Sequence, residues 1–138
     1  MGEVVVAETD YDNEQLLRKI DTIALDADYL VIEQVMNYGM AVGAEVFDTV
    51  FWSGRFAQEF GRFHRMPFLE VKLHFCHDSR AKESNVRQAV RDQFPKTGGG
   101  KRPDIGTKSQ PGPLYGVTGH AWSALALAMA FAAKQENK

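Results

Sequence analysis

Residues 29–33 read Tyr-Leu-Val-Ile-Glu, which is a run of apolar side chains followed directly by a carboxylate. A strand that is apolar on both faces belongs inside a sheet that helices cover on two sides. Ligands of such sheets bind beyond the ends of the strands. The pattern predicts a central strand over 28–35 and a functional site at Glu33. The alternative is a glutamate that has simply left the core for solvent.

The composition limits the class of protein. A chain of 138 residues predicts one domain, 1–138, that buries about two thirds of its unfolded surface. The single Cys76 cannot form an internal disulfide, and no Cys/His cluster has zinc spacing, so we expect a reducing compartment. No apolar stretch is long enough for a membrane span and no leader follows Met1. We therefore expect a soluble cytoplasmic protein.

Strands and helices are predicted to alternate along the chain. The expected strands are 3–7, 28–35 and 68–75, and the expected helices are 12–24, 43–64, 80–94 or 82–94, and 119–134. This alternation favours an α/β layer architecture. In the last helix we expect five side chains to pack inward: Ala124, Leu125, Leu127, Ala128 and Phe131.

The helix over 43–64 carries a broad stripe of large apolar side chains. Its members are Val46, Phe47, Val50, Phe51, Phe56, Phe60 and Phe63. We interpret the stripe as part of the core. The alternative is that the surplus of rings serves a dimer face.

Charge is distributed unevenly along the chain, although the formal net charge is only -2. Residues 1–61 hold 3 Lys or Arg and 12 Asp or Glu, whereas residues 62–111 hold 11 and 5. The basic part includes a predicted loop at about 95–116 with six Gly and four Pro. Such a segment is either a solvated face or a surface that follows a phosphate backbone. A nucleotide-binding loop is excluded, because Arg102 stands where the Walker motif requires Ser or Thr.

His120 stands at the predicted start of the last helix. The dipole at a helix start disfavours a charged imidazole, and a neutral imidazole can bind a metal. A histidine that only caps or packs at the helix start is the alternative. Ser123 is expected on the same side one turn further along, as a possible weak neighbour of the site.

The order of these elements resembles that of the RuvC-like Holliday-junction resolvases, and more narrowly a set of phage-borne RuvC-like proteins. The likeness covers nearly the whole chain. It is carried by Tyr38-Gly39-Met40-Ala41-Val42-Gly43, Glu45-Val46-Phe47, Arg80-Ala81-Lys82, Asn85-Val86-Arg87-Gln88-Ala89, Gly106-Thr107-Lys108, Pro111-Gly112-Pro113-Leu114-Tyr115-Gly116 and Trp122-Ser123-Ala124-Leu125-Ala126.

The resemblance implies an RNase H-like mixed sheet flanked by helices, and divalent metal, Mg²⁺ or Mn²⁺, that serves to cut DNA phosphodiesters. Glu33 matches a catalytic, metal-binding glutamate of the family. His120 and Ser123 fall where the family places two acidic residues, so His120 is the second predicted catalytic and metal ligand. Imidazole suits Mn²⁺ better than Mg²⁺.

One departure concerns the amino end. The family carries its first catalytic Asp on an opening strand that precedes the counterpart of 3–7, so the chain is expected to lack the first strands. Asp10 and Asp12 are weak candidates to replace that acid. We expect either a truncated chain or a fold that has lost catalysis and keeps DNA binding.

The resemblance and the basic block together predict a DNA surface. Its expected residues are Gln34, Tyr38, Arg80, Lys82, Asn85, Arg87, Lys101, Arg102 and Lys108. The first hypothesis is a metal-dependent endonuclease that resolves branched or double-stranded DNA as a homodimer in a bacterial or phage-infected cell, without a membrane or nucleotide cofactor. The second is a noncatalytic DNA-binding module of the same fold. A third is a metabolic α/β protein with an unrelated site, which would show no salt-dependent affinity for DNA.

Overall fold

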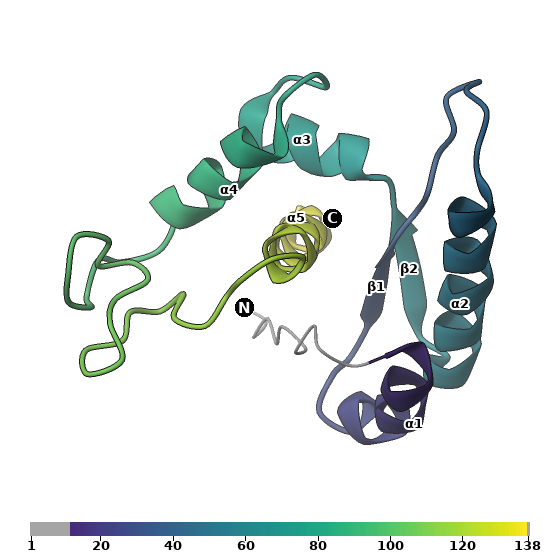
Figure 1. Ribbon diagram of the computed structural model, residues 1–138, viewed down its shortest axis with the longest axis horizontal. Helices are drawn as coiled ribbons and strands as arrows, with labels where there is room; N and C mark the ends of the chain where they lie inside the picture. The colour runs from purple at the N-terminus through teal and green to yellow at the C-terminus, as the bar shows by residue number, and fades with distance from the viewer. Residues whose placement is uncertain (1–11, 138) are drawn as a thin grey trace.

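The computed structural model describes residues 12–137 (Figure 1). In chain order its elements are α1 (Asn13–Ala24), β1 (Leu30–Glu33), α2 (Ala44–Phe60), β2 (Phe63–Met66), α3 (Phe68–Cys76), α4 (Glu83–Asp92) and α5 (Ala121–Glu136). The predicted order of helix, strand and helix is confirmed from α1 to α2, whereas after β2 the helices α3, α4 and α5 follow one another without a strand between them. The strand expected at 3–7 lies outside the described residues. No helix within 12–137 is long and apolar enough to cross a membrane.

The centre of the structure is a pair of parallel strands between two helices. β1 pairs with β2 from Leu30 opposite Phe63 to Glu33 opposite Met66. α2 and α5 both contact β1 and lie on opposite sides of the strands (Figure 1). The prediction of a strand that helices cover on both faces is therefore confirmed. Because the described strands are parallel, the antiparallel strands of a mixed sheet remain a prediction.

The strand predicted over 68–75 is wrong, because these residues form helix α3. The alternation of Leu69, Val71 and Leu73 suggested a strand, but burial follows a helical spacing instead. Val71 is fully buried, and Phe68 and Phe75 pack against the same core cluster. Residues at i, i+3 and i+7 share one side of a helix.

The second strand lies where the long helix was expected to continue. α2 ends at Phe60 because Gly61 adopts a φ of 90° and donates its N–H to the carbonyl of Ala57. A positive φ of this kind favours glycine, which has no Cβ to clash with the backbone. Phe63 consequently belongs to β2 and not to the helix.

The interpretation of the apolar stripe on the long helix as core is wrong for Phe47, Val50 and Phe51. Ala57 and Phe60 of α2 are buried, whereas Phe47, Val50 and Phe51 are 66%, 48% and 60% exposed. The reason is geometric, since α2 contacts α1 and β1 and buries Phe60, which lies on the side of the helix opposite Phe47 and Phe51. The alternative interpretation, a dimer face, stays open.

Helix α5 forms the middle of the hydrophobic core. It contacts α3, α4 and β1, and Figure 1 shows α3 leading from the end of β2 over α5, with α4 beyond it. The core residues include Val71, Val86, Val90, Leu114, Leu125, Leu127 and Phe131. Leu125, Leu127 and Phe131 are buried as predicted, whereas Ala124 is exposed.

The segment 95–116 has no regular element beyond one bridge between Gly106 and Pro111, so the predicted loop is confirmed. It is nevertheless fixed to the core. Leu114 is 1% exposed, and the buried Asp104 carboxylate accepts hydrogen bonds of 2.6 and 2.9 Å from Arg91 of α4. A Cβ at Gly112 would collide with the carbonyl oxygens of Pro103 and Asp104. The glycine there is required because two backbone segments meet closely.

We expect Asp104→Asn to lower the free energy of unfolding by about 2 kcal/mol at neutral pH, since it removes a charge-assisted hydrogen bond to Arg91. The hydrogen bond from Arg91 holds the pKa of Asp104 below its ordinary value. A carboxyl with a lowered pKa in the folded state stabilises the fold above the unfolded pKa of about 3.9 and loses this effect as the pH falls through the lower folded value.

Urea denaturation between neutral pH and pH 3 measures this effect, with the exposed Asp26→Asn as control. The difference between wild type and Asp104→Asn should narrow below about pH 4. A difference that stays constant down to pH 3 would contradict the role assigned to the ion pair.

Candidate functional site

Glu33 is the last residue of β1 and its side chain is exposed at the strand end. The next residue continues the pairing, because the Gln34 N–H donates to the carbonyl of Met66 at 2.9 Å. Surrounding atoms partly desolvate the Glu33 carboxyl, and this raises its pKa, with a smaller contribution from the negative charge of Glu83. The carboxylate thus lies at the end of a covered strand and beside a second acid.

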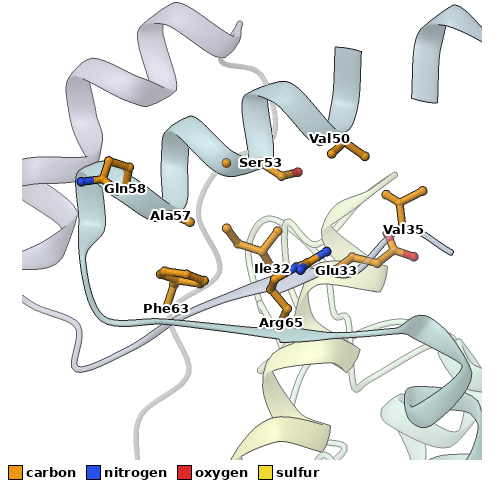
Figure 2. A pocket seen from close by; sticks show the side chains of 10 residues that line it. Ile32, Glu33, Val35, Val50, Ser53, Ala57, Gln58, Phe63 and Arg65 are labelled. Carbon is orange, nitrogen blue, oxygen red and sulfur yellow. The ribbon is translucent and has the colours of Figure 1, made fainter. Parts of the chain in front are cut away.

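A groove of about 300 Å³ opens beside Glu33, between α2 and the strands (Figure 2). Small residues of α2, Ser53, Gly54 and Ala57, form one wall, and Ile32 and Phe63 of the strands form the other. Figure 2 shows the Glu33 carboxylate near Val35. Arg65 also lines the groove and supplies its positive charge. The groove is therefore mostly apolar, with charged groups on the strand side.

A second pocket, of about 210 Å³, lies where the first turns of three helices meet. Phe68 comes from α3, Glu83 and Arg87 from α4, and His120 and Ser123 from the start of α5. Trp122 also lines the pocket, and the Arg87 guanidinium lies 5.7 Å from the centre of its ring. His120 precedes α5 as predicted, is exposed, and makes no side-chain capping hydrogen bond. The pocket is therefore lined by a guanidinium, a carboxylate, an imidazole and a hydroxyl group.

Glu83 links the two predicted site residues. It acts electrostatically on Glu33 and lines the pocket that holds His120 and Ser123. Glu33 and His120 do not line a common pocket, although β1 and α5 are in contact. No distinct signal in the sequence pointed to Glu83, because acidic residues are common in the first turn of any helix, where they complement the dipole.

The described residues do not complete a site for a divalent cation. Carboxylates at Glu33 and Glu83 and the imidazole of His120 are suitable donors. However, no group of three or more His, Cys, Asp or Glu within residues 12–137 is placed to hold a metal ion. Asp12, one of the weak candidates, instead caps α1 by accepting the Gln15 N–H at 2.8 Å. Asp10, the other candidate, lies outside the described residues.

The predicted DNA-binding residues fall into three regions. Arg80, Lys82, Asn85 and Arg87 surround the start of α4, Lys101, Arg102 and Lys108 lie on the 95–116 loop, and Gln34 and Tyr38 follow β1. All are exposed except Gln34, which is half-buried. The Asn85 side chain has a structural task, since its oxygen accepts the Lys82 N–H at 3.0 Å. The Lys and Arg side chains of the three regions lie at the protein surface.

The arrangement of strands and helices defines an α/β protein with the fold of the RuvC proteins. The structure is similar to that of RuvC from Thermus thermophilus, with a TM-score of 0.54 and 19% sequence identity, over 99% of this chain and 78% of that chain. No protein-family model matches the sequence, and no curated protein matches it. The RuvC-like fold expected from the sequence is therefore supported by the structure.

We expect Glu83→Gln to lower the pKa of Glu33, because it removes a negative charge that disfavours ionisation of the neighbouring carboxyl. Carboxyl-carbon NMR titration of Glu33 measures the change, and Glu45→Gln on α2 is the matched control. The pKa should stay above the ordinary value for glutamate in both variants, since desolvation is the larger cause. An unchanged Glu33 titration would refute the proximity of the two acids.

Proposed function

We propose that this chain is a RuvC-like resolvase, an endonuclease that binds branched DNA and hydrolyses a phosphodiester bond at Glu33. The observation that carries the proposal is the likeness to Thermus thermophilus RuvC over 99% of the chain. Within this fold, Glu33 at the end of β1 and His120 at the start of α5 both neighbour Glu83. Hydrolysis of a phosphodiester is favoured by groups that hold a metal ion or stabilise the developing charge, next to a surface that attracts phosphates.

The DNA would lie across α4, the start of α5 and the 95–116 loop. Arg80, Lys82 and Arg87 bring positive charge to the start of α4, next to the pocket that contains His120. Lys101, Arg102 and Lys108 extend the positive charge along the loop, which Asp104 and Leu114 hold against the core. Exposed cations on a fixed support suit the contact with a phosphate backbone.

The finer points of the proposal follow from the likeness. A divalent cation, Mg²⁺ or Mn²⁺, would supply Lewis-acid chemistry for hydrolysis. Glu33 and His120 are the proposed ligands, and water and the DNA phosphate would supply further oxygen ligands, since no group of three donors is placed to hold a metal within residues 12–137. We further propose that the protein works as a homodimer in a bacterial or phage-infected cytoplasm, so that two sites meet paired strands of a junction.

A second candidate function is a noncatalytic module that recognises branched DNA with the same surface. The observation that favours it is the lack of three clustered metal ligands in the described part of the chain. The basic surface on α4 and the loop serves this function equally well, since binding does not require the carboxylates.

Cleavage of an end-labelled four-way junction with Mg²⁺ or Mn²⁺ separates the two candidates. We expect Glu33→Gln to lower the cleavage rate by about 100-fold or more, as removal of a catalytic group does, and to leave junction affinity nearly unchanged. Glu45→Gln, a matched change on α2, should cleave like the wild type. A wild-type chain that binds the junction and leaves it intact would establish the noncatalytic module.

The binding surface has its own test in the salt dependence of junction affinity. We expect the Lys101→Ala/Arg102→Ala double variant to reduce the slope of log K against log salt by about 1 for each phosphate that the variant no longer binds. Arg18→Ala on α1, which removes an exposed cation from the far side of the strands, should leave the slope unchanged. Equal slopes for the wild type and the double variant would remove the loop from the DNA surface.

A further inference from the structure

The pocket of about 210 Å³ at the starts of α3, α4 and α5 contains a cation without a charged partner. Arg87 of α4 is exposed, and no hydrogen bond or ion pair joins its side chain to another residue within 12–137. Glu83 lines the same pocket one helical turn earlier, a spacing at which a glutamate and an arginine can pair, yet the two side chains form no ion pair. The N–H donors of the Arg87 guanidinium are therefore available for a ligand.

Trp122 limits the positions that this guanidinium can take. The Arg87 guanidinium lies 5.7 Å from the centre of the Trp122 ring, a distance at which a cation is attracted to the face of an indole. Trp122 is 8% exposed and belongs to the core cluster, so its ring is a fixed support. An arginine that stacks on an aromatic face still offers its planar fork of donors to a phosphate. Because Arg87 is held in this way, it loses less side-chain entropy when it binds a ligand.

The other residues of the pocket suit a small anion. Ser123 adds a hydroxyl, which can donate to a phosphate oxygen, and His120 adds a ring N–H donor. Phe68 and Trp122 supply apolar walls, and water screens a charge beside such walls less than a charge on an open surface. The volume of about 210 Å³ is below that of pockets for drug-sized molecules, which is about 300 to 1,000 Å³. A single small group therefore matches this space better than a large cofactor does.

We propose that this pocket binds one phosphate group of the DNA strand, that Arg87 is the residue that binds it, and that Trp122 positions Arg87. The inference rests on the proposed function, because it takes DNA as the ligand. Arg80 and Lys82 are exposed near the same end of α4 but do not line the pocket, so they attract DNA without fixing one phosphate. A guanidinium fork can bind two oxygens of one phosphate at once, and such a contact sets the register of the backbone on the protein.

Glu83 distinguishes this pocket from a plain basic surface. Its carboxylate lines the pocket together with Arg87, so it repels a phosphate that Arg87 attracts. Glu83 also acts electrostatically on Glu33 at the end of β1. A phosphate on Arg87 thus lies next to the acid that connects the pocket with Glu33, and this contact aligns the DNA strand relative to Glu33. Removal of Arg87 and removal of the Glu83 charge should change phosphate affinity in opposite directions.

The fluorescence of Trp122 measures phosphate binding without DNA cleavage. The chain has two tryptophans, so Trp52→Phe leaves Trp122 as the only one. Inorganic phosphate, added at constant ionic strength, should change the emission, because it moves the guanidinium relative to the ring. In this background we expect Arg87→Ala to weaken phosphate binding about tenfold or more and Glu83→Gln to strengthen it about threefold. Arg55→Ala is the matched control, since it removes an arginine that lies over the other tryptophan position.

Junction DNA with one methylphosphonate, a neutral replacement for a single phosphate, tests the same contact in DNA. The replacement is moved along one strand, and affinity is measured without divalent metal. At one position we expect it to weaken wild-type binding about tenfold and to leave Arg87→Ala binding nearly unchanged, because both changes remove the same contact. Arg87→Lys, which keeps the charge and loses the planar fork, should give an intermediate affinity. Far-UV circular dichroism and thermal unfolding check that the variants remain folded.

The outcomes separate this inference from the proposed function. Equal weakening of the wild type and Arg87→Ala at every position, or equal affinity of the two for inorganic phosphate, would overturn the phosphate pocket even if the wild type cuts the junction. A position-specific loss that requires Arg87, in a chain that leaves the junction intact, would support the pocket and establish the noncatalytic module.

Discussion

The burial of α5 between the strands and the helices α3 and α4 is the contact on which the rest of the structure depends. Its apolar residues Leu125, Ala126 and Phe131 contribute to a core that also receives Val71 from α3 and Val90 from α4. Burial of such side chains is the largest favourable term in folding. Because α5 is fixed in this way, its first turn, with His120 and Ser123, is held against the starts of α3 and α4. The candidate site is thus a consequence of core packing.

The same core holds the basic loop in place. A segment with six glycines and four prolines has little tendency to form regular structure, yet Leu114 enters the core and Asp104 binds Arg91. These two contacts fix the loop that carries Lys101, Arg102 and Lys108. They do not involve these three side chains, which stay exposed. A loop that is ordered before it meets a ligand loses less conformational entropy on binding. This is the physical advantage of such a surface for contact with a phosphate backbone.

Two surfaces of different chemistry lie near β1. The pocket that contains Glu83 and His120 lies at the starts of α3, α4 and α5, whereas the mostly apolar groove lies between α2 and the strands. Glu33 is close to both, because it lines the groove and the negative charge of Glu83 raises the pKa of its carboxyl. A single strand end therefore borders the groove and lies within electrostatic reach of the pocket that contains His120.

The sequence by itself determined the order of helix, strand and helix from α1 to α2, the helix start at His120, the covered strand that ends at Glu33 and the irregular basic loop. These features depend on local spacing, helix breakers and charge, which are read directly from neighbouring residues. It did not determine that 68–75 is a helix. The apolar residues of this segment fit both the two-residue period of a strand and the 3.6-residue period of a helix, and only packing against the core distinguishes the two. Only the tertiary structure decided that Phe47 and Phe51 face solvent and that Glu83 joins the site. Both outcomes depend on which side of a helix meets its neighbours, and that is set by contacts between residues far apart in the chain.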